Sequence, residues 1–395
     1  MVEFMLKSTT LFSYEVDNPE KALQEILNQL NSKIHLMNNS AGIIMCDPEF
    51  IKSGVVQAIG DGLPFPIAGC TTASQGVNGE AGVLMLTIMV LTSDDISFVV
   101  NAAEFVNDDV LTAAQSACES AVKSLGANPD LIFAFPSLME DKYSGDYYVE
   151  MLENACSRTP IFGLLAVDDT TVYDSCYSIC NGKSSLKAMS LIFLSGNINP
   201  RFVIGTLSDE YVLPYKGEIT KSDGRTVYEI NNMRAYDYFE NIELAKDGQF
   251  NEGMRFVPFL LDIKKCKGCD GVSVARSVIG FDENGSALGR GDMLEHSVFT
   301  LGSCSKDDIL STALNVIDKI NKFENVNGVV MFSCIARRIA LGHETFAEIN
   351  AVDKNINPQF QFMIGYAGGE ICPTSLAEGV AVNRFHNYTL IACVL

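Results

Sequence analysis

The chain has 395 residues and a formal net charge of −21, from 28 basic and 49 acidic side chains. Binding to nucleic acid or to anionic lipid needs a basic surface, so this charge argues against both. The length suits two or three domains or one duplicated assembly, and the acidic balance is typical of a solvated surface that keeps a protein soluble.

No stretch of the sequence predicts a membrane span. The most apolar run, residues 81–91, is too short to cross a bilayer and indicates a buried strand. The first seven residues lack the basic-then-apolar order of a secretion signal, which favours a cytoplasmic protein. In that compartment we expect the twelve cysteines, many of them inside apolar runs, to be reduced core residues.

The first half of the chain alternates predicted helices and strands. An extended start near residues 10–14 precedes a helix that Asn18 caps and Pro19 opens. The strands that follow are expected at residues 42–46, 66–69, 82–92, 96–103, 131–135, 161–166, 176–181, 186–195 and 201–207. The helices are expected at residues 50–59, about 108–125 and 146–156.

The second half begins with a polar region, residues 208–255, in which we expect a helix over 231–242. We place a domain boundary there, which predicts domains at 1–215 and 216–395. The later strands are expected at residues 256–263, 272–281, 297–301, 328–334, 362–367, 382–385 and 388–395, with a helix over 307–322.

One pattern occurs three times, near residues 42–73, 130–166 and 328–370. In each case an apolar run, a gap and a second apolar run lead to glycine and small residues. A pair of further strands then follows. This predicts an α/β fold built from internally duplicated strand–helix–strand–hairpin units, which form mixed sheets layered with helices and open onto a ligand cleft.

Four short motifs carry a resemblance to a known family. They are Gly-Cys-Thr-Thr-Ala at 69–73, Cys-Ile-Ala-Arg at 334–337, the segment 365–371 and Phe-His-Asn-Tyr-Thr at 385–389. In this order they resemble the FIST proteins, signal-transduction sensors with an N-terminal and a C-terminal FIST domain. The resemblance covers nearly the whole chain, and the two predicted domains would be the N-type and the C-type.

The resemblance implies a sensor of small molecules, for which an amino acid or another small carboxylate is the expected ligand. Some relatives bind haem and sense nitric oxide, and many are fused to output modules. This chain has no room for such a module, so we expect a separate output protein, such as a histidine kinase or a chemotaxis receptor.

The candidate ligand-binding residues lie where strands of the repeats end. An arginine can grip a carboxylate with two N–H groups, although Arg337 could instead pair with Glu344 or Glu370. Glu370 could face an ammonium group. The full set is Gly69, Cys70, Thr71, Thr72, Arg337, Tyr366, Gly369, Glu370, His386 and Asn387.

Two alternative functions remain open. The first is a haem-binding nitric oxide sensor, with His35, His296, His343 or His386 as the axial ligand. The second is an enzyme that uses Cys70, although the sequence shows no base to activate this thiol. We predict no catalytic residue and no metal site, because the only Cys-x-x-Cys, at 266–269, lacks a second pair of ligands.

Overall fold

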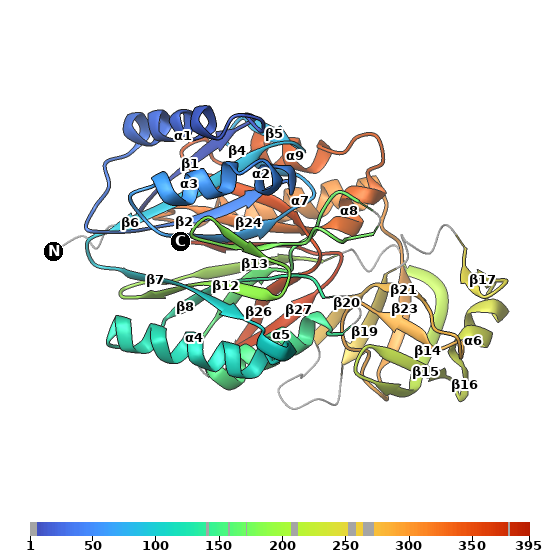
Figure 1. The fold of residues 1–395 in the computed structure, drawn as a ribbon. Coiled ribbons are helices and arrows are strands. Elements are labelled where there is room, and N and C mark those ends of the chain that lie inside the picture. Colours follow the sequence, from blue (N-terminus) through green and yellow to red (C-terminus); the bar gives the residue numbers. More distant parts are fainter. Residues whose placement is uncertain are drawn as a thin grey trace.

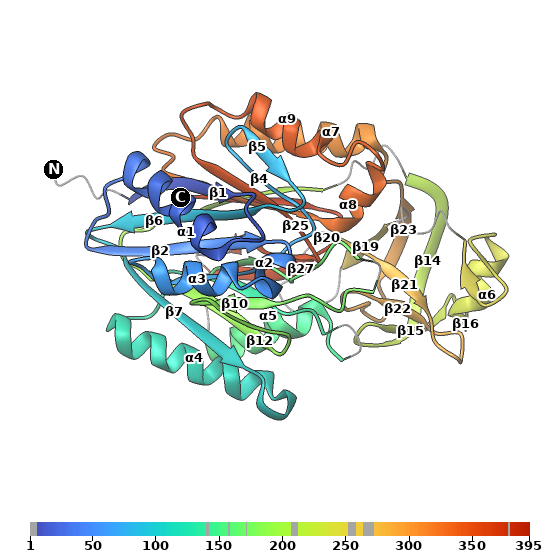
Figure 2. The same cartoon turned by 45° about the horizontal axis from the view of Figure 1, so that its top comes forward.

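The computed structural model describes residues 6–139, 142–156, 159–170, 172–206, 212–251, 258–263, 272–377 and 380–395. Three mixed sheets with helices on their outer faces form a larger part, the central body (Figure 1). A second, smaller part projects from one end of this body, on the side away from the C-terminus (Figures 1 and 2). The α/β fold with mixed sheets that the sequence predicts is confirmed.

The three sheets of the central body share one strand order. In each, two antiparallel strands lead to a parallel pair, and an antiparallel hairpin follows. The first sheet contains β1 (Leu6–Ser13), β6 (Leu86–Ser93), β2 (Asn39–Cys46), β3 (Ile67–Thr71), β10 (Ser178–Cys180) and β11 (Lys183–Ser185). The second contains β7 (Ser97–Glu104), β12 (Ala188–Ser195), β8 (Leu131–Pro136), β9 (Ile161–Leu164), β26 (Glu370–Ala377) and β27 (Val380–His386). The third contains β13 (Arg201–Gly205), β28 (Leu390–Val394), β24 (Val329–Cys334), β25 (Phe362–Ala367), β4 (Gln75–Val77) and β5 (Glu80–Gly82).

The hairpins are exchanged between the sheets in a cycle. The hairpin β4–β5 follows the parallel pair of the first sheet but joins the third, where Gly76 pairs with Ile364. The hairpin β10–β11 passes from the second sheet to the first, and β26–β27 passes from the third to the second. Each sheet is therefore completed by a hairpin that follows, along the chain, the parallel strand pair of a different sheet.

Helices cover the outer face of every sheet. The first sheet carries α1 (Pro19–Lys33), α2 (Glu49–Lys52) and α3 (Val55–Gly62). The second carries α4 (Val110–Leu125), which the 3-10 turn Val106–Asp108 precedes, and α5 (Gly145–Ala155). The third carries α7 (Lys306–Ile320), α8 (Ile335–Ala340) and α9 (Ala347–Asn355), seen along one side in Figure 2. At α1 the Asn18 side chain accepts a hydrogen bond from the Lys21 amide at 3.0 Å, which confirms the predicted cap.

The inner faces of the three sheets pack on one another and form a common core. Phe332 of the third sheet stacks on Phe162 of the second, with ring centroids 5.1 Å apart, and meets Phe135 edge-on at 6.2 Å. Met45 and Cys70 bring the first sheet to the same core, and both are fully buried. Since apolar burial is the main favourable term in folding, the sheets stabilise one another.

The smaller part, here called the barrel, is an antiparallel sheet that curls on itself. Its order is β20 (Val272–Arg276), β19 (Phe259–Ile263), β23 (Val298–Gly302), β14 (Val212–Asp223), β15 (Thr226–Ile230), β22 (Ala287–Gly289) and β21 (Val278–Phe281), with β16 (Met233–Arg234) beside β15. The two end strands, β20 and β21, are consecutive in the chain and only Ser277 separates them. Helix α6 (Ala235–Asn241) and the small hairpin of β17 (Ala245–Lys246) and β18 (Gln249–Phe250) complete it.

Several predicted elements differ from those observed. Residues 208–255 contain long strands besides the expected helix, since β14 alternates exposed and buried side chains and therefore has a polar average. Expected single strands over 82–92 and 272–281 are each split in two. In the first case Gln75 holds the break by donating to the Val83 and Met85 carbonyls. The division into domains at 1–215 and 216–395 stays a prediction.

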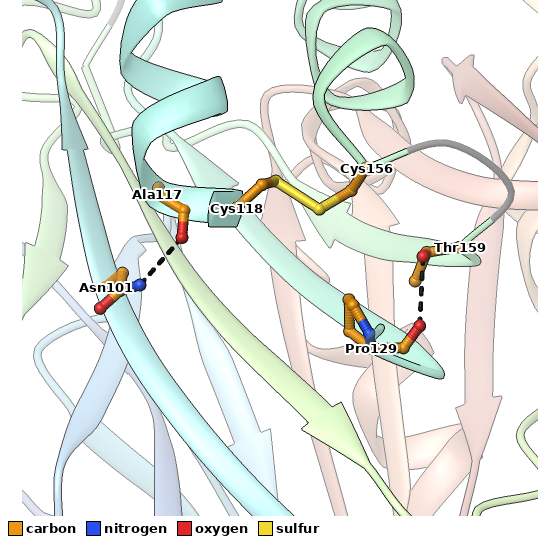
Figure 3. Close-up of a disulfide and its surroundings, with 6 residues drawn as sticks. All are labelled: Asn101, Ala117, Cys118, Pro129, Cys156 and Thr159. Carbon is orange, nitrogen blue, oxygen red and sulfur yellow. Dashed lines mark hydrogen bonds between the residues drawn. A yellow bond between two sulfur atoms is a disulfide. The ribbon is translucent and has the colours of Figure 1, made fainter. Parts of the chain in front are cut away.

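A disulfide joins two helices on the second sheet (Figure 3). It links Cys118 of α4 to Cys156, the residue that ends α5, with Cα atoms 6.1 Å apart. The expectation that all cysteines are reduced is therefore wrong for this pair. The other cysteines of the described segments are free, and most are buried. Cys266 and Cys269 lie outside the described residues.

Within the described segments, no helix combines the length and the apolar character that a membrane crossing needs.

Glycine at position 69 is required by strand packing. A Cβ atom added to Gly69 would fall on the carbonyl oxygen of Ile44, in the paired strand β2. Gly69→Ala must therefore push two buried strands apart, and we expect the free energy of unfolding to fall by about 3 kcal/mol or more. Chemical denaturation measures this loss. Gly280→Ala is the matched control, because its added methyl meets open space; an equal loss in both variants would contradict the prediction.

Candidate functional site

Three loops meet where the parallel strand pairs end, and backbone hydrogen bonds join them in a ring. We call residues 71–74, 165–168 and 366–369 the loop ring. Val167 N donates to Thr71 O at 3.0 Å, Gly368 N donates to Leu165 O at 2.9 Å, and Tyr366 N donates to Ser74 O at 3.0 Å. Each loop thus contacts both others. Ends of parallel strands are where α/β proteins place ligands.

Buried polar atoms without hydrogen-bond partners gather at this end of the body. Within the described residues, four such atoms lie in or beside the loop ring. They are Ser74 Oγ, Arg338 Nε, Tyr366 Oη and Glu370 Oε1. An unpaired buried polar atom costs about 1–3 kcal/mol, so a concentration of them marks a place where a bound polar molecule would stabilise the protein.

Arg337 lies at the centre of this region, and its own hydrogen bonds are made within the protein. The side chain is fully buried in α8. Its Nε and Nη2 donate to Glu348 Oε1 at 3.1 and 2.5 Å, and its other donors reach the carbonyls of Ile309 and Tyr388. Burial acts to lower the pKa of Arg337, but the Glu348 carboxylate outweighs this effect and raises the pKa above its ordinary value. The partner is therefore neither Glu344 nor Glu370, the two that the sequence suggested.

The neighbouring arginine is more open. Arg338 keeps 13% of its side chain exposed, and its Nη1 contacts Asp169 Oδ1 at 2.5 Å. Its Nε, which is buried, has no partner. A ligand clamp at Arg337 would require this arginine to be the more accessible of the two, but Arg338 is the more exposed. Arg338 is also the arginine whose guanidinium has a donor without a hydrogen-bond partner.

Tyr366 and Arg337 lie on the outer face of the third sheet, beneath its helices. Burial, followed by the Glu348 carboxylate, raises the pKa of the Tyr366 hydroxyl well above its ordinary value, so this group stays protonated. Ser333 Oγ donates to the second Glu348 oxygen at 2.7 Å, which fixes the carboxylate in place. Tyr366 and Ser333 thus flank the Arg337–Glu348 pair.

Glu370 and His386 face each other at the start of the β26–β27 ladder. Glu370 Oε2 accepts a hydrogen bond from Thr389 Oγ1 at 2.7 Å. Burial raises the pKa of Glu370 well above its ordinary value, which favours the neutral acid. His386 Nε2 lies 3.2 Å from the Cys372 carbonyl oxygen. Burial, followed by the positive charge of Arg276, lowers the pKa of His386 to about 3, so the imidazole is neutral near pH 7.

The segment 69–72 takes up structural roles. Gly69 O accepts a hydrogen bond from Ser190 Oγ at 2.8 Å, and Thr71 Oγ1 accepts one from the Tyr177 amide at 2.9 Å. Thr72 Oγ1 donates to Gln75 Oε1 at 2.6 Å. Cys70 points into the common core, where burial raises the pKa of its thiol well above the ordinary value. The structure therefore does not bring Cys70 together with Arg337 and Tyr366, and its thiol is not activated for nucleophilic attack.

The two remaining candidates connect strands. Gly369 has φ of 139°, and an added Cβ would fall on the Phe385 ring, so glycine is required there. Asn387 Oδ1 accepts a hydrogen bond from the amide of Ser277, which belongs to the barrel. Both residues lie beside Glu370 and His386 in the chain, and both hold the shape of this corner.

Sequence reasoning missed three participants, namely Ser74, Arg338 and Glu348. Ser74 directly follows the Gly-Cys-Thr-Thr-Ala motif and lies two positions beyond the candidate Thr72, and Arg338 is the residue after Arg337. Glu348 lies on α9, where the sequence shows no motif, and a buried acid within a helix is visible only from its contact with Arg337.

Other site types find less support. Of the four histidines, His35, His296 and His343 are exposed, and His386 is buried and bonded. Three cavities of about 520, 520 and 250 Å³ lie beside β1, α4 and β11, and none is lined by a histidine or by a predicted site residue. Over the described part of the chain, no group of His, Cys, Asp and Glu is arranged to hold a metal ion.

Removing one member of the Arg337–Glu348 pair leaves an uncompensated buried charge or acid. We expect Arg337→Met and Glu348→Gln each to lower the free energy of unfolding by about 3–5 kcal/mol, and the double variant to lose less than the sum. Chemical denaturation of the four proteins measures this. Strict additivity would contradict it. Lys322→Met, at an exposed ion pair, is the control and should have little effect.

His386 should make the fold sensitive to acid. The pKa of His386 is about 3 in the folded protein. Below about pH 6.5 the unfolded chain therefore binds a proton at His386 that the folded protein does not bind. As the pH falls from 6 to 4, the wild type should lose about 1.4 kcal/mol per pH unit relative to His386→Gln. Glu370 titrates with the opposite sign in both proteins, so only their difference is informative. His343→Gln, on the surface, should follow the wild type.

Two known family models match successive parts of the chain. The model of the FIST N domain matches residues 40–233, and that of the FIST C domain matches residues 235–373. The junction of the two lies inside the barrel. No curated protein matched the chain. FIST domains are sensory domains of signal transduction, and with both models covering nearly its whole length, this chain belongs to the FIST family.

Proposed function

We propose that this protein is a sensor whose ligand, an amino acid or another small carboxylate, binds beside the loop ring at the end of the third sheet. The observation that carries the proposal is the set of unpartnered buried atoms on Ser74, Arg338, Tyr366 and Glu370. Together they offer a cation, two hydroxyls and an acid, which suits a small molecule bearing both charges.

Each group has a definite role in this proposal. The Arg338 guanidinium would pair with the ligand carboxylate, and Tyr366 and Ser74 would donate to it. Glu370, held by Thr389, would accept the ammonium group. Arg337 would not touch the ligand, because its donors are already used; it would hold the Glu348 carboxylate in place near Tyr366.

Signalling requires that the ligand favour one conformation over another. The four atoms are buried, so a ligand can reach them only after local opening, and an open and a closed form are therefore expected. The readout would pass to a separate partner protein, such as a histidine kinase or a chemotaxis receptor. A cytoplasmic location remains a prediction, and the Cys118–Cys156 disulfide bears on it, because such bonds are rare in that compartment.

A thermal-shift screen of the twenty amino acids tests the site. A ligand at roughly 100 times its Kd should stabilise the wild type by about 2.7 kcal/mol. Glu370→Gln and Arg338→Gln should each abolish the shift, since each removes a charge partner. Arg234→Gln, at an exposed ion pair on the barrel, is the matched control and should keep it.

Two further measurements sharpen this test. Analogues that lack the ammonium group distinguish an amino acid from a simple carboxylate. A ligand ammonium should ionise the neutral Glu370 and release a proton, so the calorimetric binding enthalpy should depend on the ionisation enthalpy of the buffer. A ligand that shifts wild type and both site variants equally would disprove the proposed site.

A further inference from the structure

A buried arginine, Arg276, is one of the residues that attach the barrel to the central body. Arg276, 3% exposed, donates from Nη2 to both oxygens of Asp146, at 3.0 and 3.2 Å, at the start of α5. Its Nη1 reaches Phe385 O at 2.9 Å, and its Nε reaches Asp292 O at 3.0 Å. The Asp292 amide in turn donates a hydrogen bond to Asp146 Oδ2 at 2.7 Å. Removing this side chain would leave a buried acid and several carbonyls without donors.

Five consecutive residues, 385–389, contact the barrel and the candidate site in turn. On the barrel side, Phe385 O binds Arg276 and Asn387 Oδ1 binds the Ser277 amide at 3.2 Å. On the site side, His386 pairs with Glu370 in the ladder, Tyr388 O accepts from Arg337 at 3.3 Å, and Thr389 Oγ1 donates to Glu370. We call these residues the linking segment.

The linking segment has little freedom to absorb a displacement. Tyr388 is almost fully buried and has φ of 57°, a left-handed conformation that few side chains adopt. The next residue, Thr389, accepts a bond from the Cys334 amide at 3.0 Å. A movement of Glu370 or Thr389 is therefore passed to Asn387 and Phe385, two and four residues before Thr389, rather than lost in a flexible loop.

We propose that residues 385–389 couple the Glu370 site to the docking of the barrel, so that a change at the site alters how firmly the barrel is held. The barrel is then the part of the molecule that reports occupancy. This inference rests on the proposed function for the identity of the signal, but the coupling itself is a property of the unliganded protein and can be tested without a ligand.

Amide hydrogen exchange, read by NMR at single residues, tests the coupling. Thr389→Val removes the hydroxyl that holds Glu370, and Thr389→Ser keeps it. In the valine variant we expect several-fold faster exchange at Ser277 and Asp292, whose amides bind Asn387 and Asp146. The serine variant and the amides within β19 and β23 should be unchanged. Should Thr389→Val fail to fold, Glu370→Gln tests the same contact from the other side.

Coupling is reciprocal, so the barrel should also influence the site. Arg276→Lys keeps the charge but loses the fork that binds Asp146, and it should speed exchange at the Cys334 amide, which donates to Thr389. Unchanged exchange in both directions would overturn the coupling even if an amino acid binds. Altered exchange with no hit in the ligand screen would support the coupling and reject only the proposed ligand.

Discussion

The cyclic exchange of hairpins is the constraint on which the rest of the structure depends. Because β4–β5, β10–β11 and β26–β27 each complete a neighbouring sheet, none of the three sheets is finished by its own part of the chain. The loops that lead into these hairpins must cross from one sheet to the next at the same end of the body. The loop ring and the polar atoms around it are a direct result of that crossing.

Two kinds of ionisable group meet at this end, and their hydrogen bonding distinguishes them. Arg337 and Glu348 neutralise each other and use most of their bonding capacity inside the protein, as a stable buried pair must. Glu370 has only one of its oxygens bonded, and Arg338 has a buried nitrogen without a partner. A buried ion pair with all its hydrogen bonds made is compatible with a stable fold. Buried polar groups that lack hydrogen-bond partners lower the stability of the folded protein, and such groups are typical of ligand-binding sites.

The sequence was informative where local rules decide structure. The Asn18–Pro19 helix start and the three apolar strand pairs follow from capping and patterning, and the motifs at 334–337 and 385–389 contact each other through Arg337 and Tyr388. It could not reveal that Cys70 faces the core while Thr71 faces outward, or that Arg337 meets Glu348, because these depend on register and on contacts between distant segments. The hairpin exchange cannot be predicted from the sequence for the same reason, because the residue pattern of a strand does not show which other strand it pairs with.

The pairing of β4 with β25 also determines when the molecule can fold. Gly76 and Ile364 are separated by roughly three hundred residues, which a ribosome adds in roughly 15–60 s at about 5–20 residues per second. During that time the edge of the early hairpin has no partner, and neither the third sheet nor the common core can close. The third sheet can therefore close only after the segment around Ile364 has been synthesised, however early the β4–β5 hairpin forms.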